Sequence, residues 1–317
     1  MSTILLTGAS GFVGSHLLPH LLDSGHQVRA LVRSDTARDR ILHRLDPLRA
    51  RAVEFPMGDT TRVDSLAAAV RGVDAAVHLA AIARDFSGGR DLDRVNRGGT
   101  GNLIKAMEAA GVRRLVHQGA LGVVEEPALH YATSKARAER DVAESELDWT
   151  ILKPSLMWGD RDGFFNLVAL LVRISPGLVP YPARQDSRFQ PLWVEDLARI
   201  VVDVLARPET VGRTYELGGP DHWTYREMTA EVLRGMHRRR FLLPMPLPLI
   251  KLVARSSEVV HLPFPVASDQ LRQLAFDNIT RLDGVSREFG FAPASMKGRL
   301  TYLRRRVDDQ EPGRAAA

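Results

Sequence analysis

An apolar, strand-like run near the start of the chain leads directly into three glycines spaced three residues apart. Residues 3–14 read Thr-Ile-Leu-Leu-Thr-Gly-Ala-Ser-Gly-Phe-Val-Gly, and a helix-like pattern begins at Phe12. Glycines between a strand and a helix allow a sharp turn and bring the backbone into contact with a ligand. The N-terminus of the helix adds free N–H groups and the positive end of its dipole, which attract phosphates. The sequence therefore predicts a dinucleotide site at Gly8, Gly11 and Gly14.

The first 155 residues alternate short apolar runs with longer amphipathic ones. This alternation predicts an α/β fold in which helices cover both faces of a doubly wound parallel sheet, the Rossmann arrangement. A smaller, discontinuous C-terminal lobe is expected from the segments after Pro154. The expected nucleotide-binding domain covers residues 1–155 and is completed by about 188–219, the lobe covers 156–187 and 220–303, and 304–317 form a disordered tail. The expected strands are 3–7, 27–32, 52–55, 75–79, 114–118, 149–153 and 214–217, and the expected helices lie near 12–24, 62–70, 91–110, 133–146, 163–175 and 195–206.

Composition narrows the range of functions. The chain has no cysteine, which excludes disulfides, thiolate metal sites and a cysteine nucleophile. No apolar run approaches the ~20 residues that a membrane-spanning helix needs, and the first residues lead straight into a strand, so no signal peptide is expected. The net charge of +5 comes from scattered arginines that are not interleaved with aromatic residues, so nucleic-acid binding is not expected. We expect a cytoplasmic protein, with a weak attraction to anionic surfaces and an oligomeric state that composition leaves open.

A second motif is the Tyr-x-x-x-Lys spacing of Tyr131 and Lys135, which opens a predicted helix. Four residues place both side chains on one face of that helix, one turn apart. A nearby ammonium is expected to lower the pKa of the phenol, so that Tyr131 can act as an acid or a base nearer to neutral pH. The same lysine can bond a nicotinamide ribose.

With these two motifs the chain resembles the short-chain dehydrogenase/reductase superfamily, in its extended or atypical branch, which includes the NAD-dependent epimerases and dehydratases. The resemblance covers residues 3 to about 220 and continues more faintly to about 303. Within that branch, the segments Asp148–Ser155 and Gly163–Asn166 are most similar to relatives of the nucleotide-binding accessory subunit of respiratory complex I. The other motifs that carry the resemblance are Thr7–Gly14, Gly58-Asp59, His78–Ala81, Asn96, Tyr131/Lys135, Val194–Asp196 and Tyr215–Gly219.

The resemblance implies roles for individual residues around a nicotinamide dinucleotide. The turn and the start of its helix would hold the pyrophosphate, and Asp59 would accept from the adenine amine with Thr60 beside it. Leu79, Ala80 and Ala81 would line the ribose side, and Asn96 would brace the helix behind the site. Tyr131 and Lys135 would sit by the nicotinamide, with Pro154 and Ser155 closing over it. The turn residues in question are Gly8, Ser10, Gly11, Phe12, Val13 and Gly14.

The residues after the second expected strand bear on the choice of cofactor. A site that prefers NAD places a carboxylate there to bind the ribose 2′-OH. This chain has Arg33 and Ser34 instead, and a guanidinium pairs with a 2′-phosphate. The sequence therefore favours NADP(H), while Asp35 leaves NAD(H) open.

One position departs from the family pattern. The superfamily uses a Ser or Thr after the fifth strand to polarise the substrate, and this position falls on Ala120, with Gly119 before it. Loss of such a donor typically lowers a rate by roughly 10²–10³. Gln118 or His117 could substitute, although a strand end points only one of them inward.

Two functions therefore remain open. The first is an NADP-dependent oxidoreductase or epimerase that acts on an apolar hydroxyl or carbonyl substrate, because the second half of the chain is rich in Leu, Val, Phe and Pro. The second is a non-catalytic nucleotide-binding protein with a structural or assembly role, similar to the complex I accessory subunit. Tyr131 and Lys135 favour the first, and Ala120 favours the second.

Several other features have an ordinary structural interpretation beside a functional one. His16, His20 and His26 are interpreted as packing or surface residues rather than metal ligands, because no carboxylate sits at ligand spacing, and no metal is expected. Glu195-Asp196 is interpreted as a charge pair at a helix N-terminus.

Gly98, Gly99 and Gly101 indicate close helix packing rather than a second phosphate loop. Trp158 either lines the substrate pocket or belongs to the core. The segment Phe241–Leu249 either fills the core of the lobe or forms an apolar wall or a patch for a membrane or a protein partner, which Lys251 and Arg255 would suit.

Overall fold

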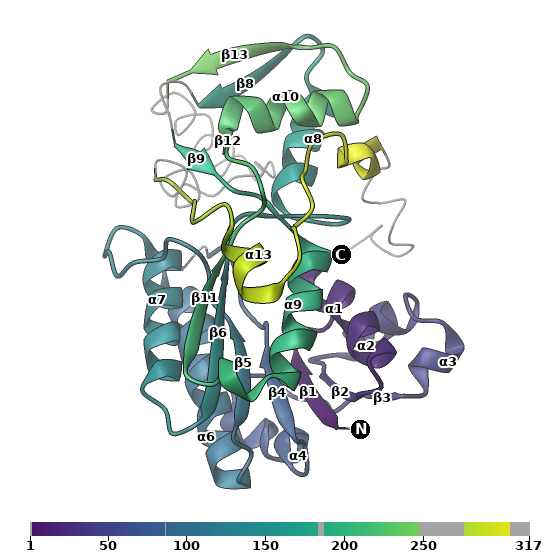
Figure 1. Ribbon diagram of the computed structural model, residues 1–317, viewed down its shortest axis with the longest axis vertical. Coiled ribbons are helices and arrows are strands. Elements are labelled where there is room, and N and C mark those ends of the chain that lie inside the picture. Colours follow the sequence, from purple (N-terminus) through teal and green to yellow (C-terminus); the bar gives the residue numbers. More distant parts are fainter. Residues whose placement is uncertain (1, 86, 183–186, 247–275, 305–317) are drawn as a thin grey trace. The chain divides into compact units, whose positions relative to one another are not determined.

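Seven parallel strands organise the first part of the chain (Figure 1). The computed structural model describes residues 2–85, 87–182, 187–246 and 276–304, and the strand order in the sheet is β3-β2-β1-β4-β5-β6-β11. Every neighbouring pair of this sheet is parallel. The order reverses between β1 and β4, and ligands of such sheets bind at the carboxyl ends of the strands at this point. The strands are β1 Thr3–Thr7, β2 Gln27–Leu31, β3 Val53–Glu54, β4 Ala75–His78, β5 Arg114–Gln118, β6 Asp148–Pro154 and β11 Arg213–Leu217.

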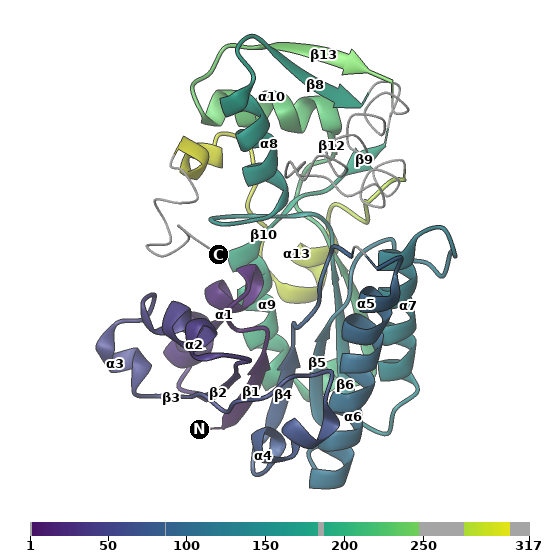
Figure 2. The same cartoon turned by 180° about the vertical axis from the view of Figure 1, so that it is seen from behind.

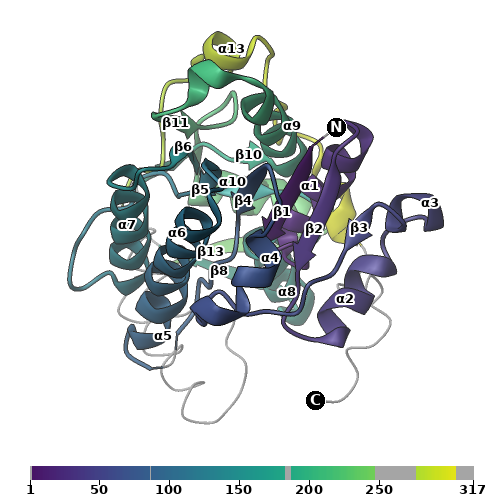
Figure 3. The same cartoon turned by 90° about the horizontal axis from the view of Figure 1, so that it is seen from below.

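Helices cover both faces of this sheet, so the expected doubly wound α/β fold is confirmed (Figure 3). Helices α1 and α9 pack together on one face, and α4, α6 and α7 lie on the other (Figures 2 and 3). The helices are α1 Phe12–Asp23, α2 Asp35–Leu42, α3 Pro47–Ala50, α4 Ala67–Val70, α5 Arg90–Leu92, α6 Gly99–Ala110, α7 His130–Ala143 and α9 Val194–Ala206, with short turns η1 Val63–Ser65, η2 Asp93–Gly98 and η3 Pro208–Thr210.

Alternate strand residues build the core between the sheet and α4, α6 and α7. Leu5, Ala76, Leu115 and Ile151 come from four adjacent strands and are buried in one apolar cluster, together with side chains such as Leu103 of α6. Since successive strand residues point to opposite faces, the residues two positions further along point the same way. This register carries His78 and His117 to the carboxyl ends of β4 and β5, directly opposite one another.

The chain divides into two compact units, and the first contains Met1–Pro154 and Val194–Leu217. The second contains Ser155–Trp193 and Gly218–Ala317. Its core gathers around Phe165 and Trp158. The elements of the second unit are β7 Met157–Trp158, α8 Phe164–Ile174, β8 Leu178–Pro182, β9 Arg188–Phe189, β10 Leu192–Trp193, β12 Trp223–Thr224, α10 Tyr225–Gly235, β13 Phe241–Met245, α13 Gly284–Phe289 and η4 Leu300–Arg304.

Strands β8 and β13 pair in parallel and lie alongside α10 (Figures 1 and 2). Only part of the segment expected to fill the lobe's core is buried there: Leu242 packs against the core, whereas Phe241 is 79% exposed. Residues 247–249 of that segment, Lys251, Arg255 and residues 305–317 of the expected tail lie outside the described residues. Within the described ranges, no helix is long and apolar enough to span a bilayer.

Candidate functional site

The turn after β1 has the close packing that only glycine allows. Gly8 has a φ of +75°, and a Cβ built there would lie 2.9 Å from the backbone nitrogen of Ala80. A Cβ on Gly14 would lie 2.3 Å from the carbonyl oxygen of Gly8. The amide of Gly11 donates to the same oxygen at 3.0 Å. The three glycines therefore fold the turn back onto the start of α1 and bring its backbone against the loop that follows β4.

The start of α1 has the features that suit an anion. Gly11 is the N-cap, no side chain caps the helix, and its first turn carries no acidic residue. Phe12 is half-buried and Val13 is buried, so apolar side chains flank this terminus. The first N–H groups of a helix have no intrahelical partner. This end of α1 thus fits a pyrophosphate, as the sequence predicts, and the turn that would hold it includes Ser10.

At the end of β2, one cation is exposed and the nearby acid is engaged. Arg33 is exposed, whereas the carboxylate of Asp35 lies 2.9 Å from the guanidinium of Arg38. Ser34 caps α2 by accepting from the amide of Ala37 at 3.2 Å, which explains why a helix begins at Asp35. The carboxylate of Asp35 thus has a cationic partner on its own helix, and the side chain of Arg33 is exposed after β2.

Asp59 and Thr60 lie in the segment that follows the carboxyl end of β3. Burial opposes ionisation of Asp59, but hydrogen bonds from the amide and hydroxyl of Thr61, both at 2.9 Å, outweigh it and lower the pKa of Asp59, with Arg33 adding to this effect. Both bonds go to Oδ1. Thr60 is buried, and a Cβ on Gly99 would lie 2.9 Å from its hydroxyl, so close packing is confirmed at this glycine. It is wrong for Gly98, where a Cβ would meet only an atom 3.7 Å away, and for Gly101, where it would meet nothing within 4 Å.

A buried hydrogen-bond chain crosses the carboxyl ends of β1 and β4. The amide of Ala80 donates to Thr7 Oγ1 at 3.3 Å, and this hydroxyl lies 2.7 Å from His78 Nδ1. His78 Nε2 lies 3.1 Å from Thr100 Oγ1, which donates to the carbonyl of Asn96 at 2.6 Å. Burial lowers the pKa of His78 to about 3, with Lys135 adding to this effect, so the ring is neutral. Because Thr100 donates its hydroxyl proton to Asn96, its oxygen accepts from His78, which places the imidazole proton on Nε2.

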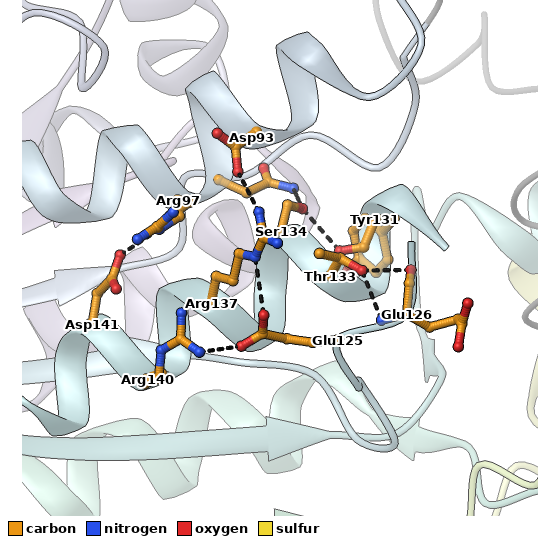
Figure 4. A network of polar contacts seen from close by, with 11 residues as sticks. Asp93, Arg97, Glu125, Glu126, Tyr131, Thr133, Ser134, Arg137, Arg140 and Asp141 are labelled. Atoms are coloured by element: carbon orange, nitrogen blue, oxygen red, sulfur yellow. Dashed lines mark hydrogen bonds and ion pairs between the residues drawn. The ribbon is translucent and has the colours of Figure 1, made fainter. Parts of the chain in front are cut away.

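Asn96 connects this chain to the helix that carries the Tyr-Lys pair. It lies in a π-helical turn, η2, where a single helix was expected from 91 to 110. Its amide nitrogen donates to the carbonyl of Ile82 and to Ser134 Oγ, both at 3.0 Å, and Ser134 donates to the carbonyl of Tyr131 (Figure 4). The extra residue of a π turn shifts the side chains that follow it. Asn96 therefore fixes the start of α7 against the loop after β4.

Ion pairs on the outer side of α7 hold the loop that precedes it (Figure 4). Glu125 pairs with Arg137 at 3.0 Å and also with Arg140. Thr133 donates to the carbonyl of Glu126 at 2.7 Å. These partly exposed contacts lie between the end of β5 and α7, so the loop is tied to the helix at several points.

The Tyr-Lys pair lies in a less polar setting than the sequence suggests. Burial, and then the charge of Glu139, raise the pKa of Tyr131 to about 12, so the expected lowering by the lysine is wrong for the protein without a ligand. Burial lowers the pKa of Lys135 to about 8, and its ammonium donates to the carbonyl of Gln118 at 2.5 Å. Tyr131 is thus a neutral phenol at physiological pH.

The end of β5 offers no donor where the family places its third hydroxyl. The three amides that follow the strand are all engaged: Gly119 with the carbonyl of Leu152 at 2.8 Å, Ala120 with Glu139 Oε1 at 2.9 Å, and Leu121 with the carbonyl of Pro154 at 2.9 Å. Neither Gly119 nor Ala120 has a polar side chain.

Within the described residues, both side chains considered as substitutes have buried polar atoms without a partner. His117 is 1% exposed and stacks on His78, and within the described residues neither of its ring nitrogens has a partner. Gln118 Oε1 is also buried without a partner there. A side chain as buried as His117 cannot reach a substrate, so it does not replace the missing hydroxyl.

Ser155 and Trp158 have structural partners within the second unit. Ser155 Oγ lies 2.6 Å from Asn278 Oδ1, which also accepts from the amide of Leu156. Trp158 is 2% exposed and stacks on Trp193 at 5.7 Å, so it belongs to the core. The hydroxyl of Ser155 is thus engaged inside its own unit.

The histidines of α1 meet a carboxylate that sequence spacing could not reveal. His16 Nδ1 lies 2.5 Å from Glu195 Oε1, and His20 Nε2 lies 2.6 Å from Oε2 of the same residue. These histidines thus pack against α9 through contacts with one carboxylate, and Glu195 is more than a charge at a helix N-terminus. Among the described residues, no group of three or more His, Cys, Asp or Glu side chains could hold a metal ion.

Comparisons with known proteins find similarity both in sequence and in fold. A family model described as NAD(P)H-binding matches residues 8–168. The mitochondrial NADH dehydrogenase [ubiquinone] 1 alpha subcomplex subunit 9 of Arabidopsis thaliana is 28% identical, over 92% of this chain and 74% of that protein. The 3 beta-hydroxysteroid dehydrogenase/Delta 5→4-isomerase of Mycobacterium tuberculosis is 27% identical, over 92% of this chain and 86% of that protein. The UDP-glucose 4-epimerase of Thermus thermophilus, in complex with NAD, has the same fold, with a TM-score of 0.70, 22% identity and coverage of 96% and 98% of the two chains.

Proposed function

This chain belongs to the NAD(P)H-binding family, and from that premise we propose that it binds NADP(H) at the carboxyl ends of β1 and β4 and uses it in hydride transfer. Such a nucleotide supplies a nicotinamide that accepts or donates hydride. The observation that carries the proposal is the glycine turn, packed so that no Cβ fits at Gly8 or Gly14, before an uncapped helix. The residues of the first unit proposed to hold the nucleotide are Gly8, Ser10, Gly11, Phe12, Val13, Gly14, Arg33, Asp59, Thr60, Leu79, Ala80, Ala81, Tyr131, Lys135 and Pro154.

The preference for NADP(H) rests on Arg33. Its exposed guanidinium follows β2, and the carboxylate of Asp35 is paired with Arg38. Titrating the protein with NADPH and NADH tests this, and we expect NADPH to bind more tightly. Arg33→Ala should weaken NADPH binding by about 10–100-fold, since a charge-assisted hydrogen bond contributes about 1.5–3 kcal/mol, and should leave NADH unchanged. Arg113→Ala, which changes an exposed arginine before β5, is the matched control. Equal loss of both nucleotides in Arg33→Ala would contradict the assignment.

In the proposed reaction, Tyr131 donates its phenolic proton to a substrate carbonyl or takes one from a hydroxyl. A neutral phenol suits donation, so near neutral pH the free protein is in the protonation state that carbonyl reduction requires. Asn96 donates to Ser134, and Ser134 donates to the backbone carbonyl of Tyr131, so these bonds hold the backbone of Tyr131 in place. Tyr131→Phe should abolish NADPH oxidation with a panel of apolar ketones and aldehydes while leaving NADPH affinity within about threefold. An unchanged rate would remove Tyr131 from the reaction.

A second candidate function is a nucleotide-binding protein without turnover, which has a structural or assembly role. The observation in its favour is the end of β5, where Gly119 and Ala120 carry no donor and the following amides are engaged. One relative is a subunit of NADH dehydrogenase, and another is a hydroxysteroid dehydrogenase, so relatives support both candidates. NADPH binding without oxidation of any substrate in the panel would favour this second function.

We also propose that the protein associates peripherally with anionic lipid surfaces through the second unit. Phe241 is paired with Leu178 across two strands, and they are 79% and 52% exposed. Ile174 is 66% exposed. The side chain of Arg240 donates to the carbonyl of Ser175, the residue that follows Ile174. Exposed apolar side chains beside Arg238–Arg240 suit an anionic interface.

Vesicle sedimentation tests this association. We expect binding to vesicles of phosphatidylglycerol, weaker binding to phosphatidylcholine, and loss of binding in Phe241→Asp. Leu48→Asp is the control, because Leu48 is 76% exposed on the first unit. Equal binding by Phe241→Asp and the wild-type protein would contradict the assignment.

A further inference from the structure

Helix α7 carries a third polar side chain on the face of Tyr131 and Lys135. Glu139 follows Lys135 by four residues, and three residues at this spacing lie on one face of a helix, one turn apart. It is 9% exposed, and a carboxylate is seldom buried unless it is paired. The Tyr-Lys motif gives it no role.

Each oxygen of Glu139 has its own partner. Oε1 accepts from the amide of Ala120 at 2.9 Å, and Oε2 lies 3.1 Å from the ammonium of Lys153 on β6. The carboxylate thus joins α7 to the ends of β5 and β6. Both groups of this ion pair are largely removed from water, so losing one partner would leave the other as an uncompensated buried charge.

The residue before Ala120 makes room for this carboxylate. A Cβ built on Gly119 would lie 2.3 Å from Glu139 Oε1 and 2.8 Å from its carboxyl carbon. Real Cβ atoms do not approach so closely, so a side chain at position 119 would displace Glu139. Position 119 therefore accommodates only a glycine, because the carboxylate of Glu139 fills the space that a side chain there would occupy.

The same carboxylate acts on Lys135. The ammonium is buried and donates to one carbonyl, that of Gln118. Burial lowers its pKa, and the negative charge of Glu139 opposes that change. Two imidazoles, His78 and His117, also interact with Lys135, and both are neutral because burial lowers their pKa. Lys153 is paired with Glu139, and Tyr131 is a neutral phenol on the same helix.

We propose that Glu139 is a positioning residue of the nucleotide site, which fixes the strand end at Gly119 and Ala120 and keeps the buried ammonium of Lys135 charged. The inference rests on the proposed function, because Lys135 matters to the protein through its bond to a nucleotide. In this role Glu139 acts through Lys135 and through the amide of Ala120.

Titration of Lys135 by NMR tests the electrostatic half without any nucleotide. The chain has five lysines, so ¹³C-labelled lysine side chains can be assigned one by one by substitution. Glu139→Gln keeps an oxygen acceptor but removes the charge, and it should lower the midpoint of Lys135 by roughly one pH unit. Lys153→Met removes a competing cation and should raise it. An unchanged midpoint in both variants would overturn the proposal.

Amide exchange at Ala120 tests the geometric half. Glu139→Ala and Gly119→Ala should both speed exchange of this amide by roughly tenfold or more, since each takes away its acceptor. Gly101→Ala is the matched control, because a Cβ there meets nothing within 4 Å. Exchange as slow in Glu139→Ala as in the wild-type protein contradicts the assignment, and circular dichroism identifies any variant that has not folded.

Nucleotide binding separates this inference from the proposed function. The affinity of the wild-type protein for NADPH should fall on the alkaline side as Lys135 loses its proton, and in Glu139→Gln this fall should begin at a lower pH. No binding by the wild-type protein would end the proposed function, while the NMR result still decides the role of Glu139. Binding with identical pH profiles in both proteins would end the role of Glu139 alone.

Discussion

Glu195 Oε2 lies 2.6 Å from His20 Nε2, and this contact joins the helix at the glycine turn to the helix by which the chain re-enters the first unit. The same carboxylate also contacts His16. Burial alone would raise the pKa of Glu195, but its bonds with the two histidines lower it to about 2. The bond with Glu195 raises the pKa of His20. The carboxylate of Glu195 therefore links α9 to α1 through the side chains of His16 and His20.

We expect Glu195→Gln to destabilise the protein most between about pH 4.5 and 6.5. Glu195 has a lowered pKa, so its contribution is complete above its ordinary value of 4.5 and is lost as the pH falls toward 2. His20 has a raised pKa, so its contribution is complete below 6.5 and is lost as the pH rises through its folded value. Urea denaturation of both proteins at pH 5.5 and 8.5 measures the difference. The loss of unfolding free energy in Glu195→Gln should be smaller at pH 8.5 than at pH 5.5. Glu209→Gln breaks a pair with Arg207 only, and its loss should be the same at both pH values. An equal difference between the two pH values in Glu209→Gln would remove the histidines from the explanation.

Gly8→Ala should weaken nucleotide binding and stability far more than Gly25→Ala. Both glycines have positive φ, +75° and +81°, so an alanine carries similar backbone strain, about 1 kcal/mol, at either position. Gly25 has open space around it, whereas a Cβ on Gly8 would meet the backbone of Ala80 at 2.9 Å. Thermal unfolding and NADPH titration of the two variants measure the contrast. Equal effects would show that the close approach at Ala80 is unimportant.

Ala120→Ser should increase NADPH-dependent reduction of a carbonyl substrate. The serine would place a hydroxyl where Gly119 and Ala120 have none, and a donor of this kind affects rates by up to about 10²–10³. We expect a gain in kcat of about 10-fold or more. The gain should stay below the full effect of such a donor, because the surrounding loop does not hold the new hydroxyl in place. The double variant with Tyr131→Phe should lose the gain. A rate in Ala120→Ser no higher than in the wild-type protein would show that the missing hydroxyl does not limit turnover.

Asp162→Asn should make the second unit more stable relative to wild type as the pH rises from about 4 to 7. Burial raises the pKa of Asp162 from 3.8 to about 7, although the hydroxyl of Tyr302, at 2.6 Å, opposes this change. Because the folded pKa is raised, the favourable contribution is complete below about 3.8 and is lost by about pH 7, on the order of 4 kcal/mol in all. Denaturation at pH 4 and 7.5 measures it. Asp277→Asn is the control and should show the opposite sign, since Arg188 lowers the pKa of Asp277.

Much of the first unit was predictable because its signals are local. The bounds of β1 and β5 coincide with the predicted strands, and the glycine turn lies at the predicted place. The matches to the NAD(P)H-binding family and to its relatives confirm the resemblance to the short-chain dehydrogenase/reductase superfamily. Periodicity and turn chemistry were sufficient there, because each element is defined by its own residues.

The contacts that define the site were harder to predict. Glu195 is 175 residues from His20, and Glu139 meets Ala120 only because α7 packs against β5. The direction of the pKa shift of Tyr131 depends on burial, which spacing does not reveal. Helix α10 was missed although its capping box, Thr224 and Glu227, is visible in the sequence.

The path of the chain limits how this protein can be dissected. Strand β11 is the outer neighbour of β6, and α9 packs on α1, yet both follow the excursion from Ser155 to Trp193. A fragment that stops at Pro154 would lack an edge strand and leave α1 without its covering helix. Production of the first unit alone calls instead for removal of that excursion, a short linker from Pro154 to Val194 and a stop after Leu217, so that one continuous gene segment encodes the whole sheet.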